Sequence, residues 1–583
     1  MHNYQSKYAT FSTTSRFLGS RLSTRLLPLT GIFLLIATVA YLHHLSFFTP
    51  LDSTEITNAS NPPPPHQTPV LIAQAREKWN TKLKRQSRTV EQAAREYRRR
   101  YGIDPPHGFD VWFEYAESQD VVLVDEYDEM MAAVLPFLEM GSTEAKRRAG
   151  LLRKERQRAN RILVGGKRED NEDYIRPAPG EEEDRLRTDK LVEMLKPVMG
   201  LLERLNWPEW SVMVSEIPEP RVLNSFGDVL EGETIWELSM PGDRRLVESI
   251  KKTCGPDSRF AKKVDNYTFE YGLEELYKGW AEWDEYKREA QGKEAWPDDA
   301  PLVDVERDMD ICASPELITS HGLFRTNWNT TKLLVPLLSY GRPSAYGDIP
   351  IPSSFQWDYL ENYLYDPSAD RTWEEKEDVI YWHGEPSGGG KGDEFFGSMH
   401  RHRLVALSNP PPSPWNHPSN LYAYTNITFS DLSPAHCVLF SCNHLTDFLP
   451  FTPRTPFSDS WRNKIVLDLD GWGPSGRWRG LISSNSLPVR STIYHEWFTD
   501  RMVPWWHYVP LSVGVTRDGL GGVVKAFLGS DEGRYWGSVI AEEGKAWAEG
   551  GMRRVDMTVY VFRLVLELNR VFNGGQWRYE IPE

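Results

Sequence analysis

The sequence predicts an α/β protein with parallel sheets, preceded by a transmembrane helix and a helical stem. Three observations lead to this fold class. Short strand-like runs such as WSVMVS, DVIYWHG and KIVLDLDG alternate with helical stretches from about Trp207 onward, which is typical of strands joined by crossover helices. This part of the chain is longer than a single hydrophobic core usually holds, so two domains are expected. An apolar run near the N-terminus is long enough to cross a bilayer.

The N-terminal segment predicts a membrane anchor. Residues 1–25 carry basic residues and no acidic one, and residues 26–48 contain no Asp, Glu, Lys or Arg. Neither the short apolar core nor the cleavage site of a removable signal peptide is evident. The basic flank orients the N-terminus to the cytoplasm. We therefore expect a type II signal anchor at 26–48, a cytoplasmic tail at 1–25 and a lumenal body.

Two further features fit a lumenal body. Glycosylation tripeptides of the form Asn-x-Ser/Thr occur at Asn58, Asn266, Asn329 and Asn426. The chain has four cysteines, an even count that permits two disulfides in an oxidising compartment. The expected pairs are Cys254–Cys312 and Cys437–Cys442, and spacing leaves other pairings open. The chain ends in YEIPE rather than a Lys-Asp-Glu-Leu retrieval signal, so we expect the Golgi membrane, with the ER membrane as the alternative.

The segment after the anchor reads as a stem and a helical region. Residues 49–72 contain SNPPPPHQTP and form a proline-rich stem. Residues 73–206 are predicted to be helical, with an exposed helix near Ala73 to Tyr101 and a second basic helix near Ser142 to Leu163. Acidic segments follow the second helix, which favours a solvated surface over a phosphate or membrane contact. The net charge of −16 argues against nucleic acid as a partner.

An acidic pair at a strand end raises the possibility of metal chemistry. Asp468 and Asp470 in LDLDG share one strand face, a spacing that suits a divalent metal bridging a nucleotide diphosphate. A similar pair at Asp308 and Asp310 illustrates how often such a short motif arises by chance. Metal binding by Asp468 and Asp470 is one interpretation of this pair, and a chance match is the other.

Two glycine turns after strand-like runs suit a phosphate group. In YWHGEPSGGGKGDEFFGSMHRHR, the strand ends before Gly384 and is followed by Lys391, Arg401 and Arg403. In LDLDGWGPSGRW, the strand is followed by glycines and Arg477. Backbone N–H groups of glycine turns approach phosphate oxygens and basic side chains neutralise their charge. Ordinary crossover turns and surface loops are the competing interpretation, but two such turns in one half fit a nucleotide held at the carboxyl ends of the strands.

The chain resembles the capsule-associated and Rumi-type protein O-glucosyltransferases of glycosyltransferase family 90, in their fungal branch. The similar stretches run from Tyr97 to nearly the C-terminus. They include CGPDSRFA, DICASPELITSHGLF, LLVPLLSYGRPSAYGDIPIPSSF, WEEKEDVIYWHGEPSGG, LDLDGWGPSGRW, SNSLPVRSTIYHEWFTDRMVPWWHYVPL and EEGKAWAEGGMRRVDMTVYVFRLVLE.

The resemblance implies a GT-B fold, with two Rossmann-like domains facing across a cleft. It places the acceptor half at 207–370 and the UDP-sugar half at 371–583. It also implies an inverting transfer without metal or cofactor, from a UDP-sugar donor carrying glucose or xylose to a glycan or glycoprotein acceptor. Under this resemblance, Asp468 and Asp470 become strand-end residues instead of metal ligands, and a metal-dependent GT-A type transferase that uses them is the second alternative function.

Donor-binding residues carry over by position. Arg477 matches the arginine of the family's Gly-x5-Arg loop, which holds the UDP diphosphate, and Gly471 and Ser475 lie in that loop. The segment His383, Gly384, Glu385 corresponds to the family's Arg-Gly-Ser, so histidine replaces the arginine and glutamate the serine. Lys391, Arg401 or Arg403 are the residues expected to compensate for the missing cation.

The expected base is the larger departure. An inverting transfer needs a carboxylate that takes the proton of the acceptor hydroxyl. The family's aspartate aligns with Pro218 in MVSEIPEPRVL, and proline cannot act as a base. Glu219 and Glu216 are the expected substitutes, and a catalytically inactive member that binds a sugar nucleotide or glycan is the alternative. Aromatic side chains of FQWDYLENYLY and VPWWHYVP are expected to line the cleft.

Overall fold

The structure, a computed structural model, describes the following parts of the chain: residues 68–154, 160–165, 175–177, 189–215, 217–223, 236–238, 244–264, 305–325, 329–331, 333–358, 363–388, 399–410, 420–430, 442–514, 517–575 and 578–579. All of them belong to one compact unit, residues 63–583. Within these ranges, no helix combines the length and apolar character needed to cross a bilayer. The predicted tail and the predicted span at 26–48 lie outside the described residues and stay predictions.

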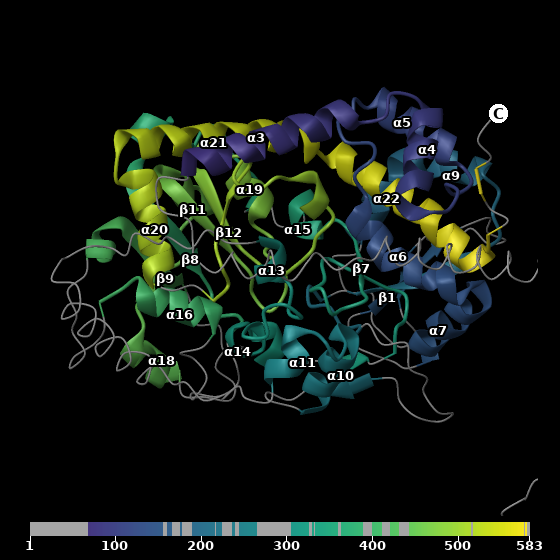
Figure 1. Ribbon diagram of the computed structural model, residues 1–583, viewed down its shortest axis with the longest axis horizontal. Helices are drawn as coiled ribbons and strands as arrows, with labels where there is room; N and C mark the ends of the chain where they lie inside the picture. Colours follow the sequence, from purple (N-terminus) through teal and green to yellow (C-terminus); the bar gives the residue numbers. More distant parts are fainter. Residues whose placement is uncertain are drawn as a thin grey trace, which may run out of the picture. The chain divides into compact units, whose positions relative to one another are not determined.

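The C-terminal part of the chain contains a six-stranded sheet in which all neighbouring strands are parallel, as predicted. The strand order is β10-β9-β8-β11-β12-β13 (Figure 1). The strands are β8 (Glu377–Gly384), β9 (Thr425–Ser430), β10 (Phe451–Thr452), β11 (Asn463–Leu469), β12 (Leu487–Ser491) and β13 (Val509–Pro510). Counted from β8, this is the 3-2-1-4-5-6 order of the doubly wound nucleotide-binding folds. The order reverses between β8 and β11, and ligands of such sheets bind at the carboxyl ends of the strands at this reversal.

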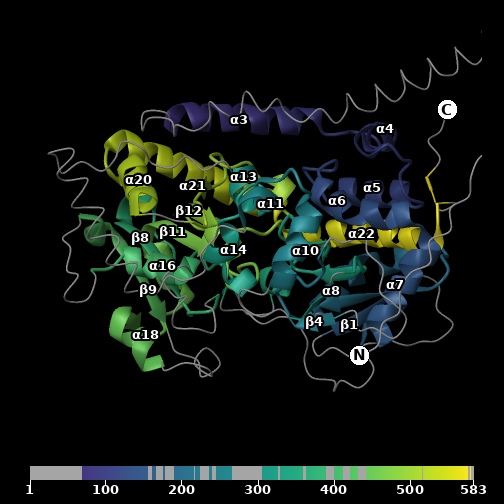
Figure 2. The ribbon, with the colours of Figure 1, turned by 60° about the horizontal axis from the view of Figure 1, so that its bottom comes forward.

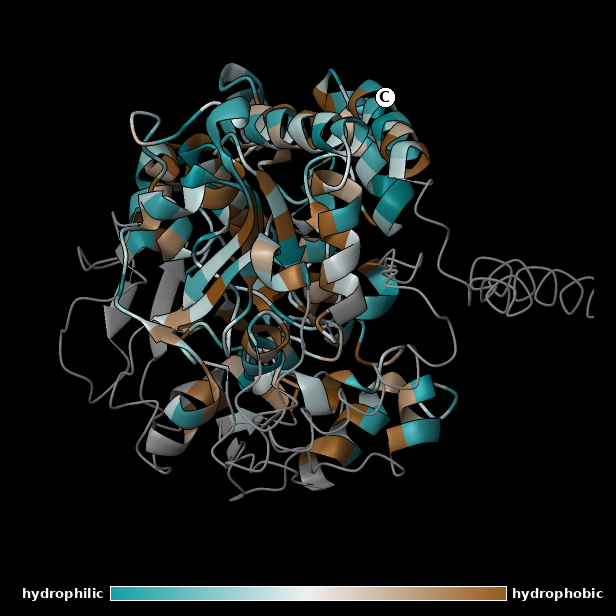
Figure 3. Cartoon of the chain, turned by 90° about the vertical axis from the view of Figure 1, so that its left-hand side faces the viewer, coloured by the Kyte–Doolittle hydropathy of each residue, from teal (hydrophilic) through white to brown (hydrophobic). Residues whose placement is uncertain are grey.

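Burial on both faces explains the apolar strand sequences of this sheet. Every residue of β11 is buried, which matches its nearly continuous apolar run, because a parallel strand is covered by helices on both sides. Helices lie around this sheet (Figure 2), and its strands carry many hydrophobic residues (Figure 3). These helices are α16 (His400–Leu407), α18 (Cys442–Phe448), α19 (Trp478–Ile482), α20 (Arg517–Leu528) and α21 (Asp531–Gly551).

A second, five-stranded sheet has the order β2-β1-β3-β6-β7 and mixes strand directions. Its strands are β1 (Asn160–Gly165), β2 (Ile175–Pro177), β3 (Trp210–Ser215), β6 (Leu337–Ser339) and β7 (Ile349–Pro350). β3, β6 and β7 are parallel, whereas β1 is antiparallel to β2 and β3. The prediction of parallel sheets therefore fails at one edge. The two sheets come from chain segments on either side of residue 370, and the predicted domain boundaries stay predictions.

The helical region differs from its prediction at two places. The first predicted helix is two helices, α3 (Thr68–Arg85) and α4 (Val90–Tyr101), and the hydroxyl of Thr89 caps the second by accepting from the Gln92 N–H. The second predicted helix ends early, since α7 covers Ser142–Lys154 and the following apolar run forms β1. The run Ile162, Leu163, Val164 is rich in residues that favour strands, and pairing with β3 supplies its backbone partners.

The remaining described elements include ten α-helices and a small antiparallel strand pair. The helices of this group are α5 (Phe109–Ser118), α6 (Asp128–Met140), α8 (Asp189–Leu195), α9 (Met199–Arg204), α10 (Arg244–Cys254), α11 (Arg259–Lys263), α13 (Val305–Met309), α14 (Leu317–Ser320), α15 (Ser354–Trp357) and α22 (Arg554–Asn573). A small antiparallel pair joins β4 (Trp236–Leu238) to β5 (Asn329–Thr331).

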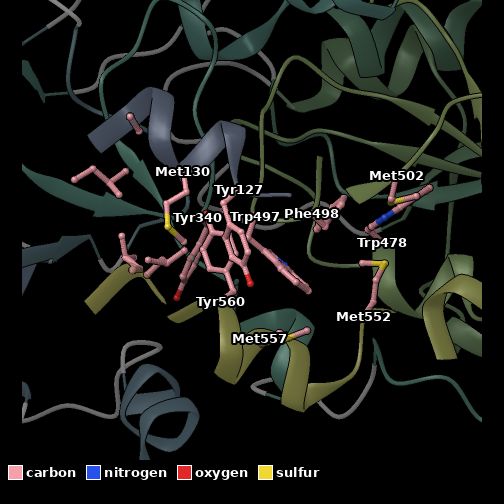
Figure 4. Close-up of a cluster of buried hydrophobic side chains, with 14 of the residues drawn as sticks. Tyr127, Met130, Tyr340, Trp478, Trp497, Phe498, Met502, Met552, Met557 and Tyr560 are labelled. Carbon is pink, nitrogen blue, oxygen red and sulfur yellow. The ribbon is translucent and has the colours of Figure 1, made fainter. Parts of the chain in front are cut away.

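The last helix, α22, is a core element. It is buried from Asp556 to Asn573 and packs against α5, α6, α7 and α8, far from it in sequence. Tyr560 on this helix stacks on Tyr127 with ring centroids 5.9 Å apart and meets the edge of Trp497 (Figure 4). The C-terminal helix thus covers the N-terminal elements instead of the six-stranded sheet.

One predicted disulfide is confirmed. Cys254, the last residue of α10, is bonded to Cys312, with their Cα atoms 5.2 Å apart. The bridge borders a smaller apolar cluster that includes Ile250, Phe260 and Ile311. The second predicted pair, Cys437–Cys442, falls outside the part of the chain whose side chains are described.

Candidate functional site

A cavity of about 1120 Å³ opens at the reversal point of the six-stranded sheet. Its walls include the carboxyl ends of β8 and β11 and the turns that follow them. Residues 217–219, which follow β3 of the other sheet, line it as well. The cavity therefore lies where the strand order predicts a ligand, and it draws residues from both sheets.

The two predicted glycine turns meet at this cavity. Gly388 has a φ of +83°, a conformation that favours glycine. A Cβ atom built on it would lie 3.0 Å from the carbonyl oxygen of Gly471 and from the ring of His400. Within the second turn, the Gly471 N–H donates to the Gly473 carbonyl at 2.9 Å. Glycine is needed here because the two turns approach each other closely, and their binding of a phosphate group stays a prediction.

Arg477 reaches from the second turn to the first. Its Nη1 donates to the His383 carbonyl at 2.8 Å, and its guanidinium carbon lies 5.5 Å from the centre of the Trp382 ring. Its Nη2 is buried and has no hydrogen-bond partner among the described residues. Ser475 is buried beside it and accepts weakly from the Arg477 N–H at 3.4 Å. Arg477, Gly471 and Ser475 all line the cavity, and one arm of the guanidinium remains for an anion.

Arg401 also lines the cavity, but its donors are engaged within the protein. Nε donates to the Asp470 carbonyl at 2.6 Å, and Nη2 donates to the Leu469 carbonyl at 3.1 Å. Nη1 donates to the Glu385 carbonyl at 2.9 Å and to the Ser387 hydroxyl at 2.6 Å. Burial, and then the nearby charge of Arg477, lower the pKa of Arg401 to about 9. Arg401 thus ties the two turns together, a structural role that the sequence prediction did not include.

Of the other residues predicted to contact the donor, some line the cavity, one does not, and one lies outside the described residues. His383 lines the cavity, and its Nε2 pairs with the Asn426 side-chain oxygen at 2.8 Å. Burial lowers the pKa of His383, so its imidazole is neutral near pH 7. Gly384 lines the cavity beside Trp382, whereas Arg403 on α16 does not line it. Lys391 lies outside the described residues. Of the two described cations among those expected to compensate for the family's arginine, Arg401 lines the cavity and Arg403 does not.

Asp468 and Asp470 point into the protein and do not line the cavity. Both are 1% exposed. Asp468 forms an ion pair with Arg490 at 3.3 Å, and the Asp470 carboxylate accepts from the Ile493 N–H at 2.8 Å. Burial raises the pKa of Asp470 to about 7. In the described ranges, no group of three or more His, Cys, Asp or Glu side chains is placed to hold a metal ion.

Glu219 lies in the same cavity as Arg477. It is 5% exposed, and Pro218 beside it packs on the second glycine turn, because a Cβ atom on Gly473 would lie 2.7 Å from the Pro218 carbonyl carbon. Both residues line the cavity. Glu216 lies outside the described residues. The structure therefore brings one of the two predicted carboxylates to the donor turns.

A buried aspartate holds the segment that carries Glu219. The Asp348 carboxylate accepts from the N–H groups of Arg221 at 3.0 Å and Val222 at 2.8 Å, and from the Ser339 hydroxyl at 2.6 Å. Burial raises the pKa of Asp348 to about 6. Sequence reasoning did not identify Asp348, because nothing local connects it to a segment 127 positions away.

The aromatic lining is confirmed for one stretch and wrong for the other. Phe355 and Tyr363 of the first predicted stretch line the cavity, together with Tyr381, Phe457 and Trp461. The residues of VPWWHYVP do not line it; Trp506 and His507 are instead buried with α3 and α21, where His507 contacts Trp79 and Trp547. These rings fill the core because α3 and α21 cover them.

Arg454 is a cavity residue that sequence reasoning missed. It follows the two-residue strand β10, lines the cavity, and donates through Nη2 to the Glu385 carboxylate at 3.0 Å. Its surroundings in the sequence, FTPRTP, carry no motif. Its position is set by the pairing of β10 with β9, and that pairing is not visible in the sequence.

The buried carboxylates predict a pH dependence of stability. Burial raises the pKa of Glu496 to about 8 against the nearby charge of Arg490. Because the folded chain holds this proton more tightly than the unfolded chain, the stabilisation is lost as pH rises toward and through 8. We expect the thermal midpoint to fall by about 1–2 °C between pH 7 and pH 9, measured by differential scanning fluorimetry at constant ionic strength.

The Glu496→Gln variant tests the origin of this slope. Glutamine keeps an acceptor for the Gln356 Nε2, which lies 2.9 Å from the Glu496 carboxylate, but it does not titrate. We expect a smaller decrease of the thermal midpoint between pH 7 and pH 9 than in the parent protein. An unchanged slope in this variant contradicts the assignment.

Comparison with known protein families gives a match over the part of the chain that builds most of this cavity. The family model described as Glycosyl transferase family 90 matches residues 323–573. The matched region includes both glycine turns, Arg401, Arg454 and Arg477, and it ends with the buried helix α22. It does not include Glu219.

Proposed function

Since residues 323–573 match the model of glycosyltransferase family 90, we propose that the chain is an inverting, metal-independent glycosyltransferase. The donor is a UDP-sugar, with glucose or xylose as the sugar, and the acceptor is a hydroxyl group of a glycan or glycoprotein. The observation that carries this proposal is the buried Nη2 of Arg477, which has no hydrogen-bond partner among the described residues and lies where both glycine turns meet.

The diphosphate of the donor lies against Arg477 and the two turns. Negative charge develops on the leaving UDP as the bond between the anomeric carbon and the phosphate oxygen breaks. A fixed guanidinium group stabilises this charge without a metal ion, since its position is set beforehand by the His383 carbonyl and the Trp382 ring. A neutral His383 adds no second cation.

Glu219 is the base in this proposal. As the acceptor oxygen attacks the anomeric carbon, the Glu219 carboxylate takes the hydroxyl proton. Support comes from its place in the cavity wall and from the hydrogen bonds by which Asp348 holds the following backbone. A base on the side of the five-stranded sheet and a diphosphate on the side of the six-stranded sheet fit the two facing halves of a GT-B enzyme.

Replacing Glu219 with glutamine is expected to lower kcat about a hundredfold, because the amide cannot accept the proton. UDP affinity is expected to change by less than about twofold, since the diphosphate contacts are elsewhere. Steady-state kinetics and calorimetric titration with UDP separate the two quantities. Full activity in this variant would remove Glu219 from the mechanism.

The reaction itself is tested with the full-length protein, purified in detergent. UDP-glucose, UDP-xylose and other UDP-sugars are offered with short glycans and glycoproteins, with and without a chelator, and UDP release and acceptor mass are measured. Transfer that persists in chelator is the expected result. Activity that disappears with the chelator and returns with a divalent metal would instead favour the metal-dependent alternative.

Pro218 favours a second function. It lines the cavity at the position where the family has its aspartate, so a chain that binds a UDP-sugar or glycan without transferring the sugar is the alternative. UDP binding with no product for any donor and acceptor would support it.

A Golgi or ER membrane location, with the catalytic part in the lumen, is part of the proposal. The apolar segment 26–48 supports it, and so does the Cys254–Cys312 disulfide, because such bonds persist in oxidising compartments. Protease protection of a tagged chain in sealed microsomes tests the orientation. Digestion of the body in intact vesicles would contradict it.

A further inference from the structure

We propose that Arg454 is a second diphosphate-binding cation, and that Glu385 holds its guanidinium group until the diphosphate displaces the carboxylate. This inference rests on the proposed function and identifies a donor-binding residue beyond the matched turns. The two residues come from different loops: Glu385 follows β8, and Arg454 follows β10. Both line the cavity.

Arg454 and Arg477 approach the same short segment. Arg477 donates to the carbonyl of His383, and Arg454 donates to the side chain of Glu385 at 3.0 Å, two residues further along. The charged groups therefore flank residues 383–385, where the β8 strand ends. A diphosphate carries charge on both phosphate groups, and two guanidinium groups at one strand end match such an extended anion.

The other basic side chains do not fill this role. Arg401, Arg454 and Arg477 are the Lys and Arg residues that line the cavity within the described ranges. All three nitrogens of the Arg401 guanidinium donate to protein acceptors of the two turns. Arg454, in contrast, has 64% of its side chain exposed, and its guanidinium forms an ion pair with Glu385, which also lines the cavity.

An exposed ion pair is easily exchanged for a stronger one. The Glu385 side chain is 35% exposed, and exposed pairs of this kind contribute little to stability. A diphosphate offers Arg454 more charge and more acceptor oxygens than a single carboxylate does. Glu385 then acts as a competitor of the donor, which explains how a glutamate is tolerated next to a diphosphate.

Calorimetric titration of the full-length protein with UDP and with uridine tests the inference. The Arg454→Gln variant is expected to bind UDP about 10–100-fold more weakly and uridine with unchanged affinity, since the lost contact is to phosphate. The Arg462→Gln variant is the matched control. Arg462 is also an exposed arginine paired with a carboxylate, that of Asp459, but it does not line the cavity.

A second variant tests the part played by the carboxylate. Glu385→Gln is expected to bind UDP about threefold more tightly, because it removes a negative charge and frees Arg454. Weaker UDP binding in this variant would overturn the displacement of Glu385 by the donor. Thermal midpoints close to that of the parent protein show that all three variants are folded.

The outcomes distinguish this inference from the proposed function. If the parent protein binds UDP no more tightly than uridine, both are overturned. If the parent binds UDP and Arg454→Gln binds it equally well, or if Arg462→Gln loses as much affinity as Arg454→Gln, this inference alone is overturned.

Discussion

The Arg477→Ala variant is expected to lower kcat/KM for the UDP-sugar by about 10³-fold while the protein remains folded. The guanidinium contacts the leaving group as its charge develops, and the loss of a single preorganised donor of this kind has effects of this order. Because the same group binds the diphosphate before reaction, UDP affinity is expected to fall as well. Initial rates over a range of donor concentrations, with UDP and uridine titrations, measure both effects.

Arg477→Lys is the matched control. Lysine keeps the positive charge but cannot donate at once to the His383 carbonyl and to a phosphate oxygen from a rigid planar group. We expect intermediate activity, with uridine affinity the same in all three proteins. Unchanged turnover in Arg477→Ala would mean that the diphosphate binds elsewhere and would end the proposed donor site.

The Glu567→Ala variant is expected to lower the free energy of unfolding by about 3–5 kcal/mol. Glu567 lies on α22 and is 0% exposed. Its carboxylate accepts from Arg563 at 3.0 Å and from Arg570 at 2.6 Å. Tyr97 on α4 donates to it as well, at 3.2 Å. Its removal leaves two buried guanidinium groups without their carboxylate partner, which costs more than the pair itself contributes.

Denaturant unfolding followed by tryptophan fluorescence measures this effect. Glu542→Ala is the control, because Glu542 is an exposed residue of the neighbouring long helix α21, where the same substitution is expected to change stability by less than about 0.5 kcal/mol. Similar stability of the two variants would contradict the structural role of the α22 charge network. Activity per folded molecule is expected to be retained, since Glu567 does not line the cavity.

Several parts of this protein follow from local sequence. The apolar run of β11 predicts a buried strand, and the glycines after β8 and β11 predict close turns. Arg477 is indicated instead by the resemblance to glycosyltransferase family 90, whose Gly-x5-Arg spacing it matches. The buried strand and the close turns depend on contacts between residues near each other in the chain. Hydrophobic periodicity and turn residues therefore predict them directly.

Other parts required the folded chain. The residues after α7 are predicted to be helical because basic, helix-like residues precede them. They form a strand because they pair with β3, a contact that local sequence does not show. Arg401 has the same local features as a phosphate-binding residue, yet its donors join the two turns. No sequence motif around Arg454 indicates a binding role.

The sequence by itself indicated the α/β class and the two glycine turns and, through the family resemblance, the cation at 477. Tertiary structure decided which side chains share one cavity with that cation. The Arg477 guanidinium meets a carbonyl 94 positions away, and Glu219 reaches the same cavity from the other sheet. Such contacts depend on strand order and burial across the whole chain, and no local pattern of residues encodes them, because side-chain periodicity reports only which face of its own element a residue occupies.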